Sequence, residues 1–454
     1  MRDVANAALA PILVVAAVLR LIHANAELWF DEIVAVLFFV RPPLATVVTS
    51  YQLAANHVLY SVLAHASAST LGERPWALRL PAIAFGVAGV WAFWFVASRV
   101  WPRTPALVGT WLFAISFHAI YYSQDARGYS AVLFFALLAT GFLLRMVDGA
   151  RTPRASDAIG YAVAIGLGLY AMLLMVFVVA GHATVLAVWR RWRPLAALAA
   201  GVALGALLYA PMAPSLIEFY RTHPADTGYP LLSDAFRRAI GPLALVLVVG
   251  GVFGLVVVAR FARRAPMTAA LLLAPLAWNV LAPLVRGQGV YPRSFIYGLA
   301  VAYLLLVEAI DWAIERWPPG AWALAGAVAI ASAVQLVPFY QLPKQGFRQA
   351  LQYIEQNRVR DDDRIGLTLG GKAVRFYDPS IALIEDAPSL RDHIGLTHRT
   401  TWIVSTFPRQ LRSDAPDLYD WLQTQTSHRA EFPGVIGDGT VHVHYWAPAR
   451  GRLP

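Results

Sequence analysis

Apolar and polar positions alternate in long blocks over the first 340 residues, rather than in the short periods of a soluble fold. Many blocks run for about 18 or more residues almost without charge, which is the length a helix needs to cross a bilayer. The pattern predicts a polytopic α-helical membrane protein. About eleven transmembrane helices are expected, at 6–24, 78–100, 104–121, 127–146, 157–171, 174–190, 194–214, 237–260, 267–285, 291–314 and 319–337. The short pair at 157–190 could instead be one bent helix.

The first outer loop, residues 25–77, carries shorter apolar runs. HVLYSVLAHASAST, which begins at His57, is too short for a typical span. We therefore expect residues 33–71 to form juxtamembrane helices that lie at the outer interface or dip into it. Pro42 and Pro43 should separate the first of these helices from the second, because proline interrupts a helix.

From residue 341 the pattern changes to that of a small soluble α/β domain, 341–454, which follows a transmembrane catalytic domain, 1–340. GFRQALQYIEQNR repeats its apolar residues with helical spacing, and PDLYDWLQTQ also predicts a helix. RIGLTL, TTWIVST and TVHVHYW predict strands. The predicted turns are DDD at 361–363 and GG at 370–371.

Charge is scarce and unevenly placed. Only 14% of the residues are charged, against roughly 25% in an average soluble protein. A net charge of +10 would suggest a nucleic-acid partner in a soluble chain, but basic loops of a membrane protein stay in the cytoplasm, so we expect no nucleic acid. The basic connections hold Arg99, Arg103, Arg145, Arg151, Arg154, Arg190, Arg191, Arg193, Arg260, Arg263 and Arg264. The first outer loop and the C-terminal domain are then expected on the outer side. The absence of cysteine excludes disulfides and thiol chemistry.

Two adjacent carboxylates, Asp31 and Glu32, directly follow the first span in ELWFDEIVAV. Acidic residues at a helix start are stabilised by the helix dipole, so a solvated helix start is the simplest interpretation of an isolated pair. Other polar clusters on the predicted outer side favour a functional role instead.

Three further clusters lie on that side. They are Gln124, Asp125, Arg127 and Tyr129 in YYSQDARGYS, His57 and Tyr60 in NHVLY with Arg79 in ERPWALRLP, and Arg293 in GQGVYPRSF. Each has a simpler interpretation when taken alone, such as an interfacial ion pair or a snorkelling arginine. Together they predict a site at headgroup depth, where arginines bind a phosphate and a carboxylate acts as general base.

His442 and His444 share one face of the predicted strand TVHVHYW. Histidines at i, i+2 are candidate metal ligands, but no third ligand is apparent, and a solvent-exposed face is the favoured interpretation. No P-loop, H-E-x-x-H or G-x-S-x-G motif is present.

At these residues the chain resembles the C-type (GT-C) glycosyltransferases that use polyprenyl-phosphate sugars. It is most similar to the bacterial family-39-like group, with relatives among protein O-mannosyltransferases and lipid A aminoarabinose transferases. The family motif W-x-D-E is matched by Trp29 to Glu32, A-L-R-L-P by Ala77 to Pro81, and Y-S-Q-E-A-R-x-Y by Tyr122 to Tyr129, with Asp125 replacing Glu. Partial matches are H-P-P-L-Y-Y at His57, Leu59 and Tyr60, P-R-Y at Pro292 and Arg293, and K-x-x-(W/F)-R at Lys344, Phe347 and Arg348. The motif Y-T-H-Y is absent, since Tyr170 is followed by Ala171, Met172 and Leu173.

The resemblance implies an inverting glycosyltransferase (EC 2.4) in the bacterial cytoplasmic membrane, with its active site and C-terminal domain outside. It would move a sugar from a polyprenyl-phosphate donor to a glycan, lipid or protein acceptor of the cell envelope. Asp31 would be the base or acceptor-orienting carboxylate, with Glu32 and Asp125 as further acidic groups. The implied substrate-binding residues are Arg79, Arg127 and Arg293 for the lipid phosphate, together with His57, Tyr60, Gln124 and Tyr129. No cofactor is required by the sequence, although Asp31 and Asp125 could hold Mg²⁺ or Mn²⁺.

Two other functions stay open: a transporter or flippase for lipid-linked sugars, and a non-catalytic protein that binds them. A transporter should line a path at mid-membrane depth with polar residues. The predicted spans carry almost no charge, and Glu308 and Asp311 lie near a span end, which disfavours transport.

Overall fold

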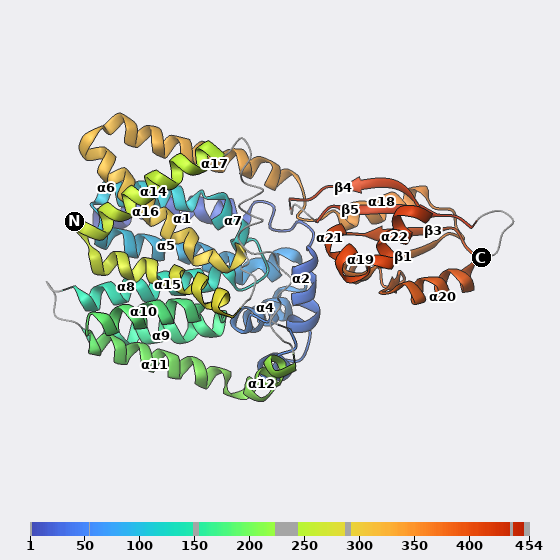
Figure 1. The fold of residues 1–454 in the computed structure, drawn as a ribbon, viewed down its shortest axis with the longest axis horizontal. Helices are drawn as coiled ribbons and strands as arrows, with labels where there is room; N and C mark the ends of the chain where they lie inside the picture. The colour runs from blue at the N-terminus through green and yellow to red at the C-terminus, as the bar shows by residue number, and fades with distance from the viewer. Residues whose placement is uncertain are drawn as a thin grey trace. The chain divides into compact units, whose positions relative to one another are not determined.

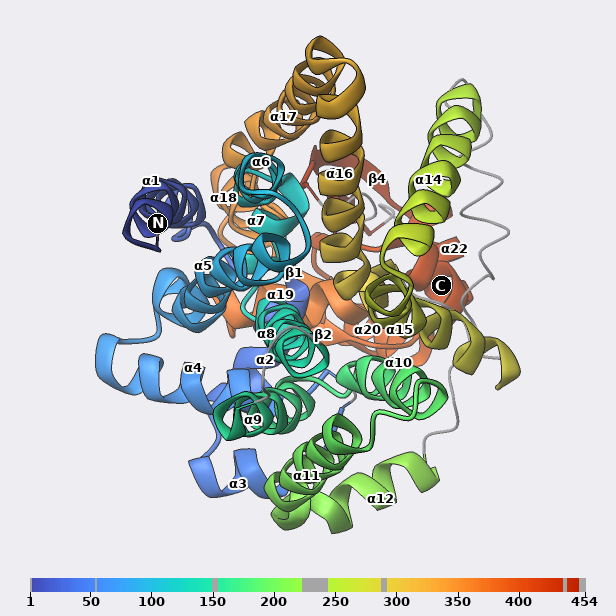
Figure 2. The same cartoon turned by 90° about the vertical axis from the view of Figure 1, so that its left-hand side faces the viewer.

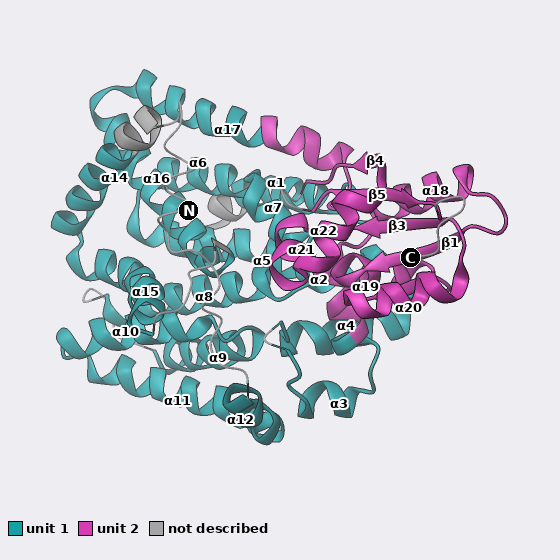
Figure 3. Ribbon diagram, turned by 45° about the vertical axis from the view of Figure 1, so that its right-hand side comes forward, with its two compact units in different colours: residues 1–24, 38–333 teal, residues 25–37, 334–454 magenta. Residues whose placement is uncertain are grey.

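The chain divides into two compact units (Figure 3). The first contains residues 1–24 and 38–333, and the second contains residues 25–37 and 334–454. The computed structural model describes residues 2–53, 55–148, 154–222, 244–286, 292–435 and 439–448. The segment with Asp31 and Glu32 therefore belongs to the unit that carries the C-terminal domain.

The first unit is a helical bundle, and Figure 2 looks roughly along several of its helices. Its α-helices are α1 (Arg2–Leu21), α3 (Leu44–Thr49), α4 (Val58–Leu71), α5 (Pro75–Val100), α6 (Arg103–Ala114), α7 (Phe117–Ser123), α8 (Tyr129–Val147), α9 (Ala155–Ala171), α10 (Met175–Val188), α11 (Trp192–Tyr209), α12 (Ala213–Thr222), α14 (Ala244–Arg264), α15 (Pro266–Val285), α16 (Ile296–Arg316) and most of α17 (Pro318–Gln341). Two 3₁₀ turns, η2 (Ala210–Met212) and η3 (Pro292–Phe295), complete it.

The bundle is that of a multi-pass membrane protein. Within the described ranges, six helices are long and apolar enough to cross a bilayer, or seven if α6 and α7, bent by 53°, count as one span. Four shorter apolar helices include α9 and α10. The predicted count of about eleven spans is not confirmed, and the beginnings of the spans predicted at 237–260 and 291–314 lie outside the described residues.

The segment 157–190 is not one bent helix. α9 packs mainly on α8 and α11, whereas α10 packs mainly on α15. Met172, between them, is extended, with φ −165° and ψ 134°. The prediction of short helices in the first outer loop is confirmed by α3 and α4, and the Pro42–Pro43 break falls before α3. Their depth in a membrane stays a prediction.

The second unit is built on a five-stranded mixed sheet (Figure 1). The strands β1 (Asp363–Leu367), β2 (Ala382–Ile384), β3 (Thr401–Ser405), β4 (Ser427–Phe432) and β5 (Val441–Trp446) run in the order β2-β1-β3-β5-β4. β1 is parallel to β2 and β3, and β5 is antiparallel to β3 and β4. The helices are α2 (Phe30–Ala35), α18 (Phe347–Asn357), α19 (Thr368–Tyr377), α20 (Ala387–Thr397), α21 (Pro408–Asp414) and α22 (Pro416–Gln425), and the π-helical turn η1 (Val36–Val40) follows α2.

Most sequence predictions for this domain are confirmed. The three predicted strands are β1, β3 and β5, and the two predicted helices are α18 and α22. Asp363 is already the first residue of β1, so the strand begins one residue before the predicted end of the turn at 361–363. The predicted turn at 370–371 is wrong, because both glycines lie inside α19. A Cβ on Gly371 would lie 2.3 Å from the carbonyl oxygen of Gly366 in β1, so the glycine permits α19 to pack directly on the strand.

Gly371→Ala should therefore destabilise the C-terminal domain by about 1–3 kcal/mol, the usual cost of overpacking. Gly395→Ala is the matched control, because that glycine lies in α20 with open space around its Cβ position. Alanine there should be neutral or slightly stabilising, since it is the better helix former. Both effects are measured by thermal unfolding of the full-length protein, with protease sensitivity of the C-terminal domain as the readout. Equal behaviour of the two variants would contradict the proposed packing.

Candidate active site

Several predicted site residues of the first unit meet where helices begin and end. Arg79, in the first turns of α5, donates to the carbonyl of Ala24, 2.9 Å away. Gln124, at the end of α7, donates through Nε2 to the carbonyls of Arg20 at 2.9 Å and Ile22 at 2.6 Å. Gln124 therefore binds the end of α1, whose last carbonyls have no partner within the helix, and Arg79 binds the turn that follows it.

Arg20, which the sequence did not single out, links the end of α1 to α6 and α7 from inside the bundle. Its side chain is fully buried and donates to the hydroxyl of Ser123 at 3.1 Å and the carbonyl of Ala114 at 3.0 Å. Ala114 ends α6 and Ser123 ends α7, so one guanidinium joins both sides of the 53° bend. A single arginine inside an otherwise uncharged span was the signal for this role.

His57 lies at the start of α4 and pairs with the start of α8. The backbone N–H of Gly128 donates to His57 Nδ1 over 3.0 Å, so the imidazole accepts at Nδ1 and carries its proton on Nε2. A Cβ on Gly128 would lie 2.8 Å from His57 Cβ, so this approach requires glycine. The Tyr129 ring stands 5.3 Å from the imidazole, centroid to centroid.

Two arginines act on this imidazole. Burial lowers the pKa of His57 well below its ordinary value, and the charges of Arg127 and Arg293 lower it further. Arg127 is buried with its guanidinium 5.2 Å from the centroid of the Tyr129 ring, while Arg293 is exposed. The buried Asp125 adds an acidic group that acts, like both arginines, on Tyr122. His57, Arg127 and Tyr129 of the predicted cluster thus lie together, and Asp125 and Arg293 are near enough for their charges to influence the pKa of Tyr122.

Tyr60 has a structural setting. It is buried, and its hydroxyl donates to the carbonyl of Leu78 over 3.0 Å, which joins α4 to α5. Like Gln124 and Arg79, it supports the walls around the cluster through backbone carbonyls. Direct substrate contact by these three residues stays a prediction.

The acidic pair of the second unit is split by its surroundings. Glu32 is fully buried, lies 3.6 Å from the ammonium of Lys344, and accepts from the backbone N–H of Trp29 at 3.3 Å. The Lys344 ammonium also lies 5.7 Å from the centroid of the Trp29 ring. Asp31 is partly exposed. Glu32 thus anchors the start of α2, and the catalytic roles of Asp31 and Glu32 stay predictions.

Gln345 completes the attachment of this segment. Its Oε1 accepts from the backbone N–H of Phe30 at 2.8 Å, and its Nε2 donates to the hydroxyl of Thr406 at 3.2 Å and the carbonyl of Gly439 at 3.1 Å. Tyr377 donates to the carbonyl of Leu28 over 2.8 Å. Residues 28–32 are therefore bound to the C-terminal domain by partly buried hydrogen bonds as well as by the ion pair.

The described residues contain one group of three side chains close enough to share a metal ion, and it includes neither Asp31 nor Asp125. The described donors thus do not form a three-ligand site around either carboxylate. Their role as ligands of a divalent cation stays a prediction.

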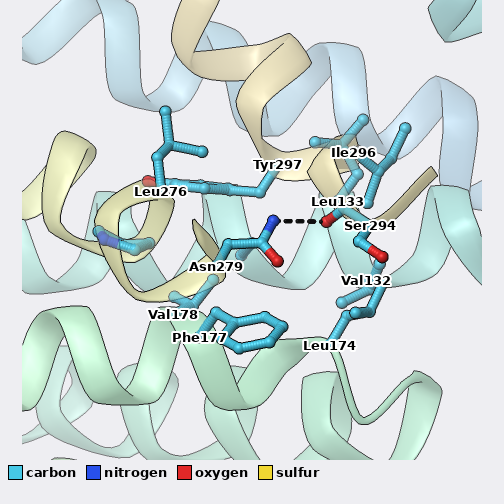
Figure 4. Close-up of a pocket in the computed structure, with 12 residues that line it drawn as sticks. Val132, Leu133, Leu174, Phe177, Val178, Leu276, Asn279, Ser294, Ile296 and Tyr297 are labelled. Carbon is cyan, nitrogen blue, oxygen red and sulfur yellow. Dashed lines mark hydrogen bonds between the residues drawn. The ribbon is translucent and has the colours of Figure 1, made fainter. Parts of the chain in front are cut away.

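A small apolar cavity lies beside η3 (Figure 4). It has room for about one water molecule and is lined by α8, α10, α15 and α16. The amide of Asn279 donates to the carbonyl of Ser294 over 2.8 Å, and its Oδ1 has no hydrogen-bond partner among the described residues. The cavity fits a buried water better than a substrate.

Solved structures resemble this chain over nearly its whole length. ArnT from Cupriavidus metallidurans matches with a TM-score of 0.53 and 15% identity, over 96% of this chain and 97% of that one. An oligosaccharyltransferase from Archaeoglobus fulgidus, in complex with Zn and sulfate, matches with a TM-score of 0.57 and 13% identity, over 92% of this chain and 72% of that one. The chain has the fold of the C-type glycosyltransferases. No family model and no curated protein matches its sequence significantly.

Other structures of these neighbours contain lipid phosphates. ArnT was also solved bound to undecaprenyl phosphate, with a TM-score of 0.52, 15% identity and 98% coverage of both chains. The archaeal oligosaccharyltransferase AglB was solved with an inhibitory peptide and a dolichol-phosphate, with a TM-score of 0.55, 12% identity, and coverage of 98% of this chain and 74% of that one. At these identities the comparison establishes the GT-C fold.

The Glu32–Lys344 pair should be worth more than a surface ion pair. Glu32→Gln and Lys344→Met should each destabilise the C-terminal unit by about 3 kcal/mol, because each leaves a buried charge without its ion-pair partner. The double variant should lose at least about 1 kcal/mol less than the sum. Urea unfolding of the full-length protein, read by protease sensitivity of the C-terminal domain, gives these values.

The exposed pair Lys372–Glu385, 2.8 Å apart in the same unit, is the control for this cycle. Its disruption should cost less than about 1 kcal/mol, because water solvates both groups. Equally small effects at the two pairs would contradict the anchoring role of Glu32.

His57 should make the bundle less stable in mild acid. Its folded pKa lies below the unfolded value, so the unfolded chain takes up a proton near pH 6.5 that the folded chain does not. Stability should therefore fall as the pH drops below about 6.5, by at most about 1.4 kcal/mol per pH unit from this group. Thermal unfolding measured between pH 7.5 and 5.5 should show a shallower dependence in His57→Asn. The exposed His398, at φ 49°, gives the control His398→Asn, which should keep the wild-type slope. An unchanged slope in His57→Asn would refute the assignment.

Proposed function

We propose that this chain is an inverting glycosyltransferase that moves a sugar from a polyprenyl-phosphate donor to an acceptor. The observation that carries the proposal is the convergence of Arg127 and Arg293 on a neutral histidine at one end of a GT-C bundle. Two guanidiniums, one buried and one exposed, suit a phosphate held at the membrane surface, because arginine binds phosphate through paired N–H groups.

The proposed reaction is a single displacement. The acceptor oxygen attacks the anomeric carbon while the bond between that carbon and the phosphate oxygen breaks, and the electron pair leaves with the phosphate. Asp31 takes the acceptor proton, or orients the acceptor, as general base. Arg127 and Arg293, with Arg79 close to the same helix ends, stabilise the charge that develops on the departing phosphate. Inversion follows because one displacement reverses the configuration of the carbon.

Location and domain roles complete the proposal. Residues 1–340 form the catalytic transmembrane domain in a bacterial cytoplasmic membrane, and 341–454 form a domain on the outer side that binds the acceptor or covers the site. The basic connections at the other bundle end, which include Arg145 at the end of α8, support this orientation. The displacement above uses no metal, and Asp31 and Asp125 stay the candidate ligands if Mg²⁺ or Mn²⁺ stimulates transfer.

Asp31→Asn should abolish transfer while leaving the protein folded. A strain lacking this chain is complemented with wild type, Asp31→Asn or the exposed control Asp361→Asn, and its envelope lipids, glycans and glycoproteins are compared by mass spectrometry. Wild type and Asp361→Asn should restore the missing sugar mass, whereas Asp31→Asn should lower the rate at least about 100-fold, the usual contribution of a general base. Full restoration by Asp31→Asn would refute its catalytic role.

Purified protein separates the enzyme from a flippase or a binding protein. With a synthetic polyprenyl-phosphate sugar, Arg293→Gln should raise the half-saturating donor concentration about tenfold, whereas Arg193→Gln, exposed near the start of α11, should leave it unchanged. Donor binding with no sugar transfer to any acceptor fraction of the envelope would favour the other two functions.

A further inference from the structure

The edge of the C-terminal sheet carries a cluster that the proposed transferase does not use. β4 is the last strand of the sheet and pairs only with β5. The cross-strand register sets Glu431 opposite His442 and His428 opposite His444. The sequence alone offered His442 and His444 without a third ligand, and β4 supplies two further donors on the same face.

A β-bulge makes this arrangement possible. Between His428 and Ala430 the register shifts, so β4 has one more residue than β5 at this point. Residues three positions apart on a regular strand face opposite sides of the sheet. The extra residue, Arg429, brings His428 and Glu431 to the same side, and bulges commonly re-aim side chains in this way.

Three of the side chains place their metal-ligating atoms close to one another. Single donor atoms of His428, Glu431 and His442 all lie within 4.8 Å of one another. Glu431 Oε1 is 3.6 Å from His428 Nε2 and 3.7 Å from His442 Nδ1. Donors around tetrahedral Zn²⁺, with bonds of about 2.1 Å, are about 3.4 Å apart, so small side-chain rotations complete the geometry.

The three candidate ligands are open to solvent, and a fourth histidine lies beside them. The His428 and Glu431 side chains are 43% and 59% exposed and His442 is 20% exposed, so an ion can reach them from solvent. His444 is buried beside them with its ring centroid 5.1 Å from that of His428.

We propose that His428, Glu431 and His442 bind a Zn²⁺ ion that cross-links strands β4 and β5. Two imidazoles and a carboxylate are ligands that zinc accepts, and they leave a fourth position for water or an additional group. Zinc binding should stabilise the folded domain, because the unfolded chain has no preformed site for the ion. The simpler interpretation is a charged edge strand that discourages pairing with another sheet, but that role needs no bulge to align its side chains.

The test is a titration of the full-length protein, purified in detergent with a tag that lacks histidine and stripped with a chelator. Zn²⁺ alone is added at pH 7.5 against a competing chromophoric chelator. Wild type should bind one equivalent, and His428→Asn and Glu431→Gln should each weaken that equivalent at least about tenfold. His398→Asn, which changes an exposed histidine outside the cluster, should bind as wild type does.

Two further measurements make the assignment specific. Lowering the pH to 5.5 should release the ion, because zinc binds deprotonated imidazole. Saturating Zn²⁺ should protect residues 427–446 from proteolysis in wild type and not in His428→Asn. The proposal is overturned if all four proteins bind zinc equally, or if none of them binds it. If none binds zinc, the role left for these residues is that of a charged edge strand. Neither outcome depends on sugar transfer, so the proposed function is tested separately.

Discussion

A charge buried in this protein has to find its partner inside the chain, because neither lipid nor a packed core can solvate it. Arg20 meets this requirement in the bundle by donating to Ala114 and Ser123. Glu308 meets it at another end of the bundle, where Arg264 lies 2.6 Å and Arg260 3.2 Å away. Arg20 thus joins the ends of α1, α6 and α7, and Glu308 joins the middle of α16 to the end of α14. The charges that cost most to bury therefore link separate helices.

The same constraint explains why the motifs mix two kinds of residue. In YYSQDARGYS, Gln124 binds the end of α1, while Asp125 and Arg127 join the cluster around His57. In ELWFDEIVAV, Glu32 is buried against Lys344, while its neighbour Asp31 is partly exposed. A reactive side chain needs a backbone that does not move, and the adjacent residue supplies the hydrogen bonds that hold it. Support and chemistry are therefore neighbours in the sequence.

The spacing of apolar residues predicted most of the helices and strands, because these elements depend mainly on residues close together in the sequence. The helices α5 and α8 to α11 and the strands β1, β3 and β5 follow from apolar spacing alone, whereas the single span predicted at 104–121 is divided into α6 and α7 by a 53° bend. The two glycines of α19 suggested a turn because the reason for them lies in other elements: Gly371 closely approaches Gly366 in β1, and Gly370 closely approaches Ser405 in β3. The partners of Arg20 are about a hundred residues away, and a bulge in β4 decides which side chains join His442. Contacts of this kind depend on register and bend angle, which no spacing rule contains.

The position of the arginines gives the strongest argument for an anionic ligand. Arg145, Arg260 and Arg264 have acidic partners at their helix ends, with Asp157 and Glu308 among them. The orientation that keeps this basic side in the cytoplasm puts Arg127 and Arg293 outside, where topology disfavours positive charge. Both act on a histidine that burial keeps neutral, so the imidazole adds no third positive charge and can donate through Nε2. Two cations beside a neutral hydrogen-bond donor suit a phosphate, which supports the proposed lipid-phosphate ligand.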